Sequence, residues 1–338
     1  MSEVKAINLA LQGGGAHGAF TWGVIDHLLE SPRVRIEGIS GTSAGAMNGV
    51  VTADGLLEGS EEIAREKLES FWSAVSKAAL LSPIKRTPLD MWMGNWSLDY
   101  SPGYLTFDIF SRVVSPYQFN PLGIDPLRDI IDSHVDFERV RACRYLKLFV
   151  SATNVRSGKQ RVFRREEMDL DAVMASACLP FLYKAVEIDG EAYWDGGYVG
   201  NPALFPLMEE CDSRDIAIVQ INPIYRDKVP RSAAEILNRM NEITFNASLI
   251  KEVRTIAMLK RLIEVSDSDL ECYRDTHFHR IDAEDTLHSL SVSSKLNAEW
   301  LFLKHLKQQG RRTAERWLDE HFDALGERST LDIDTVYM

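Results

Sequence analysis

The segment Ala6–Gly18, with the sequence AINLALQGGGAHG, determines the first elements of the fold. Its apolar run Ala6–Leu11 suits a buried strand and leads directly into a glycine-rich turn at Gly13, Gly14 and Gly15. Three consecutive glycines leave several backbone N–H groups free to converge on one small anion. Apolar residues at helical spacing follow, so the segment predicts a strand, a turn that can hold an anion, and a helix.

The next part of the chain repeats this order with a serine at its centre. An apolar run over residues 34–39 is followed by Gly-Thr-Ser-Ala-Gly, a G-x-S-x-G elbow around Ser43. Such an elbow lifts a serine hydroxyl out of a strained strand-to-helix turn. Gly41 and Gly45 permit the strand and the helix to cross closely. The helix predicted over residues 44–53 directs its positive end toward Ser43, which favours an oxyanion there.

Further apolar and amphipathic runs complete the predicted architecture. Strands are predicted over residues 145–152, 161–163, 185–188, 216–221 and 276–281. Longer helices are predicted over residues 61–80, 233–262 and 298–325. Strand, glycine turn and helix in repetition are typical of a parallel α/β sheet that carries its active residues at the strand ends. We therefore predict an α/β fold with a mainly parallel central sheet.

A serine nucleophile needs a proton acceptor, and the best candidate in this chain is an aspartate. None of the histidines after Ser43 lies in a glycine-rich loop; they are His134, His277, His279, His288, His305 and His321. Asp195 lies in the sequence Tyr-Trp-Asp-Gly-Gly-Tyr, between aromatic residues and the glycines Gly196 and Gly197. This context is typical of a buried turn, where the acid either stabilises the turn or acts as a base. An aspartate with the ordinary pKa of about 3.9 is a weak base, so burial would have to raise its pKa.

The glycine turn has a second interpretation. Gly13, Gly15 and Gly18 also match the G-x-G-x-x-G pattern of dinucleotide-binding proteins, and Glu37 lies near the expected ribose-binding position. In that pattern the acidic residue ends the second strand beside an open adenosine pocket. Here the chain turns at once into the elbow at Ser43, whose helix would crowd that pocket. The anion-binding interpretation is therefore favoured, and no cofactor is expected.

Composition and charge limit the classes of function. The chain has 338 residues and a net charge of −12, which argues against nucleic acid as a partner and against charge-driven adhesion to anionic membranes. Any lipid contact would have to use apolar surface. No cluster of His, Asp or Glu has the spacing of a zinc or calcium site. The four cysteines show no C-x-x-C spacing and are expected to be reduced core residues.

Length and patterning suggest one large domain with additions. We expect an α/β core over residues 1–222 and a mainly helical extension packed on it over residues 223–338, with a frayed tail after Gly326. Within the core, residues 81–123 are rich in proline, and eight of the 29 residues from 91 to 119 are aromatic, against 9% in the whole chain. Such an insertion suits a lid or substrate funnel, or a cap whose aromatics pack a small core of their own. With neither a signal peptide nor a transmembrane run, we expect a cytoplasmic protein; a specialised export system would leave no such mark.

The three motifs together resemble those of the patatin-like phospholipases. Members of that family have a G-G-G-x-x-G oxyanion turn, a G-x-S-x-G nucleophile about thirty residues further on, and a late D-G-G or D-G-A. All three occur here in the same order, and the segments 175–180 and 195–202 look like those that precede and carry the family's aspartate. The resemblance covers residues 5–222. It departs at His17, where the family often has Arg or Lys, so a neutral histidine would weaken the positive field there, although His17 could also act as a pH-dependent cation.

The resemblance implies a three-layer α/β/α fold with a Ser–Asp dyad and no catalytic histidine. Ser43 would be the nucleophile, Asp195 the general base, and the N–H groups of Gly13, Gly14 and Gly15 the oxyanion donors. The substrate would be an acyl ester of a lipid, as for a phospholipase A or lysophospholipase, with transient contact at a membrane interface. The alternatives are an esterase or depolymerase for a storage polyester or neutral short-chain ester, and a catalytically idle lipid-binding protein.

Overall fold

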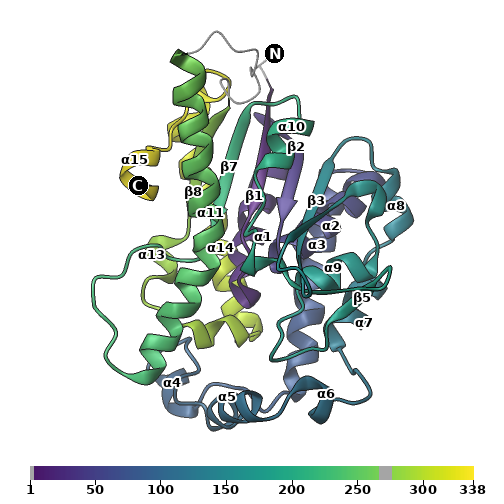
Figure 1. Ribbon diagram of the computed structural model, residues 1–338, viewed down its shortest axis with the longest axis vertical. Helices are drawn as coiled ribbons and strands as arrows, with labels where there is room; N and C mark the ends of the chain where they lie inside the picture. The colour runs from purple at the N-terminus through teal and green to yellow at the C-terminus, as the bar shows by residue number, and fades with distance from the viewer. Residues whose placement is uncertain (1–3, 266–275) are drawn as a thin grey trace.

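The computed structural model describes residues 4–265 and 276–338, and one mixed sheet lies at its centre (Figure 1). Its strands are β1 (Lys5–Leu11), β2 (Val34–Gly41), β3 (Lys147–Asn154), β4 (Gln160–Arg164), β5 (Val186–Ile188), β6 (Glu191–Asp195), β7 (Asp215–Gln220) and β8 (His277–Asp282). The spatial order is β5-β6-β3-β2-β1-β7-β8, with β4 also paired to β3. Strands β3, β2, β1, β7 and β8 run parallel, whereas β4 and β6 run antiparallel to β3. The predicted α/β class with a mainly parallel sheet is confirmed.

Helices cover both faces of the sheet, which explains the continuous apolar runs of its central strands. Along β1, Leu9 and Leu11 belong to one buried cluster and Ala10 to another. The first cluster includes residues of α1 (Gly18–Glu30), α2 (Ala44–Glu58), α3 (Glu61–Ala78), α7 (Pro126–His134), α8 (Phe137–Ala142), α9 (Leu170–Ser176) and α14 (Trp300–His321). The second includes residues of α10 (Phe205–Glu210), α11 (Ala233–Val265) and α15 (Ile333–Tyr337). The fold therefore has three layers, as the resemblance implied.

Residues on both sides of the division predicted at residue 222 share these two clusters. Strand β8 extends the sheet beside β7, and α14 packs against α1. The predicted fraying of the C-terminal tail is wrong: Tyr337 is buried, and its hydroxyl donates a hydrogen bond to Gln220 Oε1 at 2.7 Å. A buried polar anchor therefore holds the end of the chain against the sheet.

The insertion over residues 81–123 contains helices rather than only irregular chain. They are α4 (Pro88–Trp92), α5 (Pro102–Val113) and α6 (Pro116–Phe119), and each begins with a proline that follows a serine or threonine cap. These helices lie at the bottom of Figure 1, below the carboxyl ends of β1 and β2. No residue of α5 is buried, and Trp92, Tyr100 and Tyr117 are exposed. Phe110 and Phe119 pack edge to face within the insertion, so part of its aromatic content is packed and part lies at the surface.

The insertion is joined to the C-terminal part of the chain near the predicted site. Arg86 forms an ion pair with Glu299 at 2.6 Å, and the Leu98 N–H donates to Ser293 Oγ at 2.8 Å. The 3-10 turn η5 (Val292–Leu296), which contains Ser293, contacts η1 (Gly15–His17) in the glycine turn. The insertion, η5 and the glycine turn therefore form one continuous edge of the molecule.

Candidate active site

Ser43 lies between the end of β2 and the first residue of α2, in a strained backbone conformation. Its φ of 55° and ψ of −120° are rare for a residue with a side chain. The Ser43 N–H donates a hydrogen bond to the buried Ser176 Oγ at 2.9 Å. Thr42 Oγ1 donates to the Gly200 C=O at 2.7 Å, which fixes the residue before the serine. The elbow is thus held by contacts from α9 and from the loop after Asp195.

Close backbone approaches explain why glycines flank the serine. A Cβ on Gly45 would lie 2.4 Å from the Leu11 C=O, and a Cβ on Gly13 would lie 2.8 Å from the Ser43 Cβ. Both distances are shorter than a side chain tolerates. The glycine turn after β1 and the elbow after β2 can therefore touch only because these positions lack side chains.

The register of the sheet brings Asp195 to the level of Ser43. Gly41 at the end of β2 pairs with Val150 of β3, and Ala152, two residues further along β3, pairs with Asp195 of β6. Ser43 also lies two residues beyond Gly41. The elbow at Ser43 and the turn at Asp195, which are about half of the chain apart in sequence, therefore lie at the same end of the sheet. Only β3 separates the strands that carry them.

Asp195 is fully buried, and its two carboxylate oxygens differ in their surroundings. Oδ1 accepts a hydrogen bond from the Gly197 N–H at 2.7 Å. Oδ2 has no hydrogen bond of ordinary length and angle within the described chain, although the Ser43 hydroxyl is close enough to act on the carboxylate as a hydrogen-bonding neighbour. The pKa of Asp195 is raised to about 6, because burial opposes its ionisation by more than the Gly197 N–H, the Ser43 hydroxyl and the charge of Lys295 favour it. A carboxylate with this pKa is a stronger base than an exposed aspartate.

The glycine turn offers its N–H groups unequally. The Gly13 N–H donates to Asn201 Oδ1 at 2.7 Å, so it is already occupied. In the described part of the chain, the N–H groups of Gly14 and Gly15 donate to no protein acceptor. Gly15 has a φ of 57°, in the region that favours glycine, and a Cβ there would lie 2.5 Å from the Lys295 C=O. Gly14 and Gly15 are therefore the two members of the turn that can bind an anion.

His17 is buried in the same turn and carries no charge near neutral pH. Its Nε2 lies 2.7 Å from Ser294 Oγ, which itself donates to the Ser291 C=O and so accepts from the imidazole. Burial, and to a lesser extent the charges of Lys295 and Arg226, lower the pKa of His17 to about 3. The prediction that His17 could act as a pH-dependent cation is therefore wrong.

The other glycines predicted for the site allow neighbouring elements to pack closely around it. A Cβ on Gly18, at the start of α1, would lie 2.6 Å from the Ala44 Cβ, and one on Gly41 would lie 2.6 Å from the backbone of Gly45. A Cβ on Gly196 would lie 2.1 Å from the Ser151 C=O. Side chains at these positions would separate the elements that carry Ser43 and Asp195.

The rival interpretations find little support in the structure. Glu37 accepts hydrogen bonds from the N–H groups of Asp212 and Ser213 at 2.7 and 3.0 Å, so its carboxylate is engaged in the fold rather than facing a ribose site. Within residues 4–265 and 276–338, no histidine is hydrogen-bonded to Ser43; His279 instead bonds Asp215 at 2.9 Å. No group of three or more His, Cys, Asp or Glu in those ranges could hold a metal ion. No described helix is both long and apolar enough to cross a bilayer.

Three residues of the site received no role from sequence reasoning. Ser176 and Asn201 lie in the two segments whose sequence resembles the family's, so a signal was present without indicating their hydrogen bonds. Lys295 lies in no motif, because it reaches the glycine turn from a segment far along the chain.

Of the four cysteines, Cys143, Cys178 and Cys211 are buried free thiols, and Cys272 lies outside the described residues.

Comparison with known proteins identifies the class to which this fold and site belong. A family model described as patatin-like phospholipase matches residues 9–208, which is more than half of the chain. The chain therefore belongs to the patatin-like phospholipase family, whose members are lipid acyl hydrolases. A search of curated proteins found no match.

Solved structures with detectable similarity share little sequence with this chain. VipD from Legionella pneumophila is 16% identical with a TM-score of 0.47, and the match covers 93% of this chain and 67% of VipD. The type III effector ExoU is 14% identical with a TM-score of 0.36, and the match covers 94% of this chain and 54% of that one. In the complex of ExoU with SpcU from Pseudomonas aeruginosa, the match covers 94% of this chain and 53% of ExoU, at 14% identity and a TM-score of 0.34. This chain thus spans about two thirds of VipD and about half of ExoU.

Proposed function

We propose that this protein is a lipid acyl ester hydrolase of the phospholipase A or lysophospholipase type, acting through a Ser43–Asp195 dyad. The observation that carries the proposal is the buried Asp195 carboxylate beside the elbow serine, with a pKa raised to about 6. Its Oδ2 lacks an ordinary partner in the described chain, so it is available for the proton of the Ser43 hydroxyl. Family membership supports lipid acyl hydrolysis as the class of reaction.

In the first half of the reaction, Ser43 Oγ attacks the ester carbonyl carbon while Asp195 takes the hydroxyl proton. The carbonyl oxygen becomes an oxyanion, which the N–H groups of Gly14 and Gly15 stabilise. The tetrahedral intermediate then collapses: the bond to the alcohol oxygen breaks, the alcohol leaves with the proton from Asp195, and an acyl-serine remains.

In the second half, the regenerated Asp195 carboxylate takes a proton from water as the water oxygen attacks the acyl carbon. The same two N–H groups stabilise the second oxyanion. The bond to Ser43 Oγ breaks, Ser43 recovers its proton from Asp195, and the fatty acid leaves. The scheme needs no metal and no cofactor.

A cavity beside the aspartate is the proposed acyl-chain site. It has a volume of about 300 Å³, and its lining includes Met174, Ala177, Cys178 and Tyr183. The Cys178 C=O accepts a hydrogen bond from the Asp195 N–H at 2.8 Å, so the cavity wall is continuous with the catalytic turn. Apolar side chains in this wall suit a hydrocarbon chain, and the charged groups elsewhere in the lining suit the polar headgroup of an amphipathic substrate.

The proposed contact with a lipid surface is made by exposed apolar side chains of the insertion, which we call the insertion surface. It comprises Leu81, Leu89, Trp92, Ile109, Val113 and Leu122, each at least 63% exposed. These residues lie on the segment that is joined through η5 to the glycine turn. Because the chain has a net charge of −12, apolar contact rather than attraction to anionic headgroups is the expected mode of binding.

The test is labelling with a fluorophosphonate, read by intact mass, together with hydrolysis of a lipid-ester panel. One adduct is expected on the wild type and none on Ser43→Ala, and Asp195→Asn should label at least about a hundredfold more slowly. Glu252→Gln is the matched control, because Glu252 is a half-buried carboxyl of α11 whose pKa is raised to about 7 by desolvation and whose carboxylate accepts from the N–H groups at the start of α10. Its labelling should equal that of the wild type.

The outcomes separate the proposal from its alternatives. Turnover that survives Ser43→Ala would refute the dyad, and a well-folded wild type without adduct in the presence of lipid micelles would indicate an idle lipid-binding protein. A labelled enzyme that cleaves short-chain esters or a storage polyester, but no phospholipid or lysophospholipid, would make it an esterase or depolymerase.

A further inference from the structure

Residues far along the chain complete the surroundings of the glycine turn. In η5, Ser294 bonds His17, and the Lys295 C=O lies where a side chain on Gly15 would have to be. The Lys295 side chain therefore starts at the oxyanion turn. Its position depends on the C-terminal part of the chain, outside the residues matched by the family model.

The Lys295 ammonium is held between the glycine turn and the aspartate turn. Nζ donates to Asn222 Oδ1 at 2.8 Å, and Asn222 Nδ2 donates to the Gly13 C=O at 2.9 Å. Nζ also lies 5.2 Å from the centre of the Phe245 ring, the same ring that a Cβ on Gly197 would meet at 2.5 Å. The Lys295 ammonium thus contacts Asn222, which bonds the glycine turn, and Phe245, which packs against the turn after Asp195.

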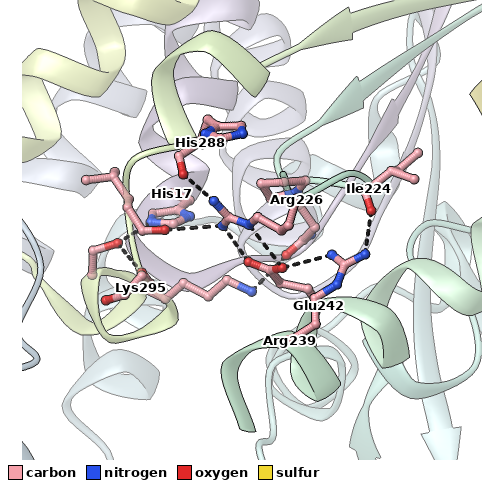
Figure 2. Close-up of polar contacts among 12 residues, drawn as sticks. His17, Ile224, Arg226, Arg239, Glu242, His288 and Lys295 are labelled. Carbon is pink, nitrogen blue, oxygen red and sulfur yellow. Dashed lines mark hydrogen bonds and ion pairs between the residues drawn. The ribbon is translucent and has the colours of Figure 1, made fainter. Parts of the chain in front are cut away.

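This ammonium has no carboxylate partner in the described ranges. Glu242 of α11, whose charge acts on Lys295, is buried and is bound by Arg226 at 2.5 Å and by Arg239 at 3.0 Å. Figure 2 shows the Lys295 side chain extending toward this group, with His17 above it in this view. Two arginines already satisfy Glu242, so the charge of Lys295 is left to act on the catalytic groups.

The charges around Lys295 have opposing effects on it. Burial lowers the pKa of Lys295, the charges of Glu242 and Asp195 raise it and that of Arg226 lowers it, with a net pKa of about 8. His17, which faces the same space from the glycine turn, is neutral. Lys295 in turn lowers the pKa of Asp195. The group that can carry positive charge beside the oxyanion turn is thus Lys295 rather than His17.

We propose that Lys295 is a positioning residue of the catalytic site, whose positive charge keeps Asp195 ionised and stabilises the negative charge that develops on the ester during attack. This inference rests on the proposed function. A half-buried cation fixed by Asn222 and Phe245 is preorganised, so it needs no reorientation when the oxyanion forms, and the surrounding protein screens it less than water would. It acts on the transition state more than on the bound ester, and its loss should lower kcat more than it raises KM.

The test compares Lys295→Met and Lys295→Arg with the wild type over a range of pH, on a soluble uncharged ester. Lys295→Met should lower kcat at least about tenfold with little change in KM. In the pH profile of kcat for this variant, the acidic limb should move upward by roughly one pH unit, because the cation that lowers the pKa of Asp195 is gone. The alkaline limb, expected near pH 8 in the wild type from the pKa of Lys295, should disappear in this variant. Lys295→Arg should retain most of kcat and also lose that limb, because a guanidinium does not titrate there.

Lys304→Met is the matched control, since Lys304 is an exposed lysine of α14 that lies 5.9 Å from the centre of an aromatic ring, that of Trp300. It should leave kcat and both limbs unchanged. Melting temperatures show whether each variant folds, and Lys295→Gln replaces Lys295→Met if the latter does not. If Lys295→Met has the kcat and the pH profile of the wild type, the charge of Lys295 plays no role. The same conclusion follows if Lys295→Arg and Lys295→Met lose equal amounts of kcat. A wild type that neither labels nor hydrolyses would instead overturn the proposed function itself.

Discussion

Asn201 accepts a hydrogen bond from the Gly13 N–H through its Oδ1 at 2.7 Å, which ties the loop after Asp195 to the glycine turn. Its Nδ2 donates to the Phe245 C=O at 3.1 Å, and its own N–H donates to Ser248 Oγ at 3.2 Å, so α11 holds it in place. The direction of the free N–H groups at Gly14 and Gly15 therefore depends on a side chain that follows Asp195 in the sequence. The glycine turn and the turn at Asp195 are positioned as one unit.

Replacing Asn201 with alanine should impair the oxyanion turn without removing any reacting group. The Gly13 N–H would be left buried without its acceptor, which costs about 1–3 kcal/mol and loosens the turn. We expect fluorophosphonate labelling of Ser43 to slow about tenfold or more. Asn8→Ala is the control, because Asn8 is equally buried and donates to the Ser213 C=O at 2.8 Å away from the turn. Equal labelling rates in the two variants would contradict this role for Asn201.

The parts of the fold that could be predicted are those that depend on local sequence. The apolar run of β1 and the glycines after it fix a strand and a turn within a few residues, and the same holds for the elbow around Ser43. These elements appear where they were expected, with ends shifted by a few residues. The exposed character of the insertion helices was not predictable in this way, because aromatic residues that serve a surface and those that fill a core have the same composition.

What could not be predicted depends on long-range contacts. The neutral state of His17 follows from burial under η5, and the anchoring of the tail follows from one hydrogen bond between Tyr337 and Gln220. Lys295 reaches the site only because η5 packs on Gly15. None of these contacts leaves a periodicity or spacing in the sequence, so only the folded chain reveals them.

The hydrogen bond between Ser43 N–H and Ser176 Oγ gives a second prediction. Ser176→Ala removes the acceptor of a buried N–H at the strained elbow, so the serine should lose its fixed orientation. We expect kcat to fall about tenfold with KM nearly unchanged, and the free energy of unfolding to fall by about 1–3 kcal/mol. Ser40→Ala is the control, since Ser40 is a buried serine of β2 that bonds the Ala203 C=O at 2.6 Å without touching the nucleophile. A comparable loss of kcat in Ser40→Ala would show that general loosening, rather than the elbow, is responsible.

The buried Asp195 carboxyl should make the protein less stable at neutral pH. Because burial raises the pKa of Asp195 from 3.8 to about 6, its ionisation is opposed in the folded state, and stability is lost as the pH rises from about 4 to about 6. Asp195→Asn cannot ionise and its oxygen can still accept from the Gly197 N–H. The variant should therefore gain up to about 3 kcal/mol relative to the wild type above about pH 7, and almost nothing near pH 4.

Urea unfolding at both pH values measures this difference. Asp189→Asn is the control, because Asp189 is an exposed aspartate in the turn between β5 and β6. A pH-independent difference between Asp195→Asn and the wild type would mean that the carboxyl does not titrate in this range.

The cavity beside Cys178 should determine which acyl chains are accepted. Ala177 is 7% exposed and lines this cavity, so Ala177→Leu would fill part of it. We expect kcat/KM for a long-chain p-nitrophenyl ester to fall about tenfold, while the value for the butyrate changes little, since a short chain does not reach the added methyl groups. Leu170→Met, on the helix that Ala177 follows but outside the residues lining the cavity, should change neither value. Equal effects on both esters would place the acyl chain elsewhere.

The insertion surface should matter only when the substrate is part of a lipid surface. Leu81, Trp92 and Leu122 are 95%, 84% and 85% exposed, and replacing all three with serine removes apolar area that would enter the lipid. Because burying one such side chain contributes about 1.5–3 kcal/mol, affinity for neutral phosphatidylcholine vesicles should fall at least about tenfold. The rate on a soluble short-chain ester should stay the same, because no reacting group changes. Flotation with vesicles and the two hydrolysis rates measure these effects.

The control for this surface is a double variant, Tyr145→Ser with Met258→Ser. These side chains are 71% and 60% exposed and lie outside the insertion, Tyr145 just before β3 at the opposite edge of the sheet. Vesicle binding should be unaffected by the control and should hardly respond to added salt in any variant, since contact is apolar rather than ionic. If the triple variant binds and hydrolyses vesicles as the wild type does, the lipid surface meets the protein elsewhere. If binding instead falls steeply with salt, positive groups rather than the insertion surface mediate the contact.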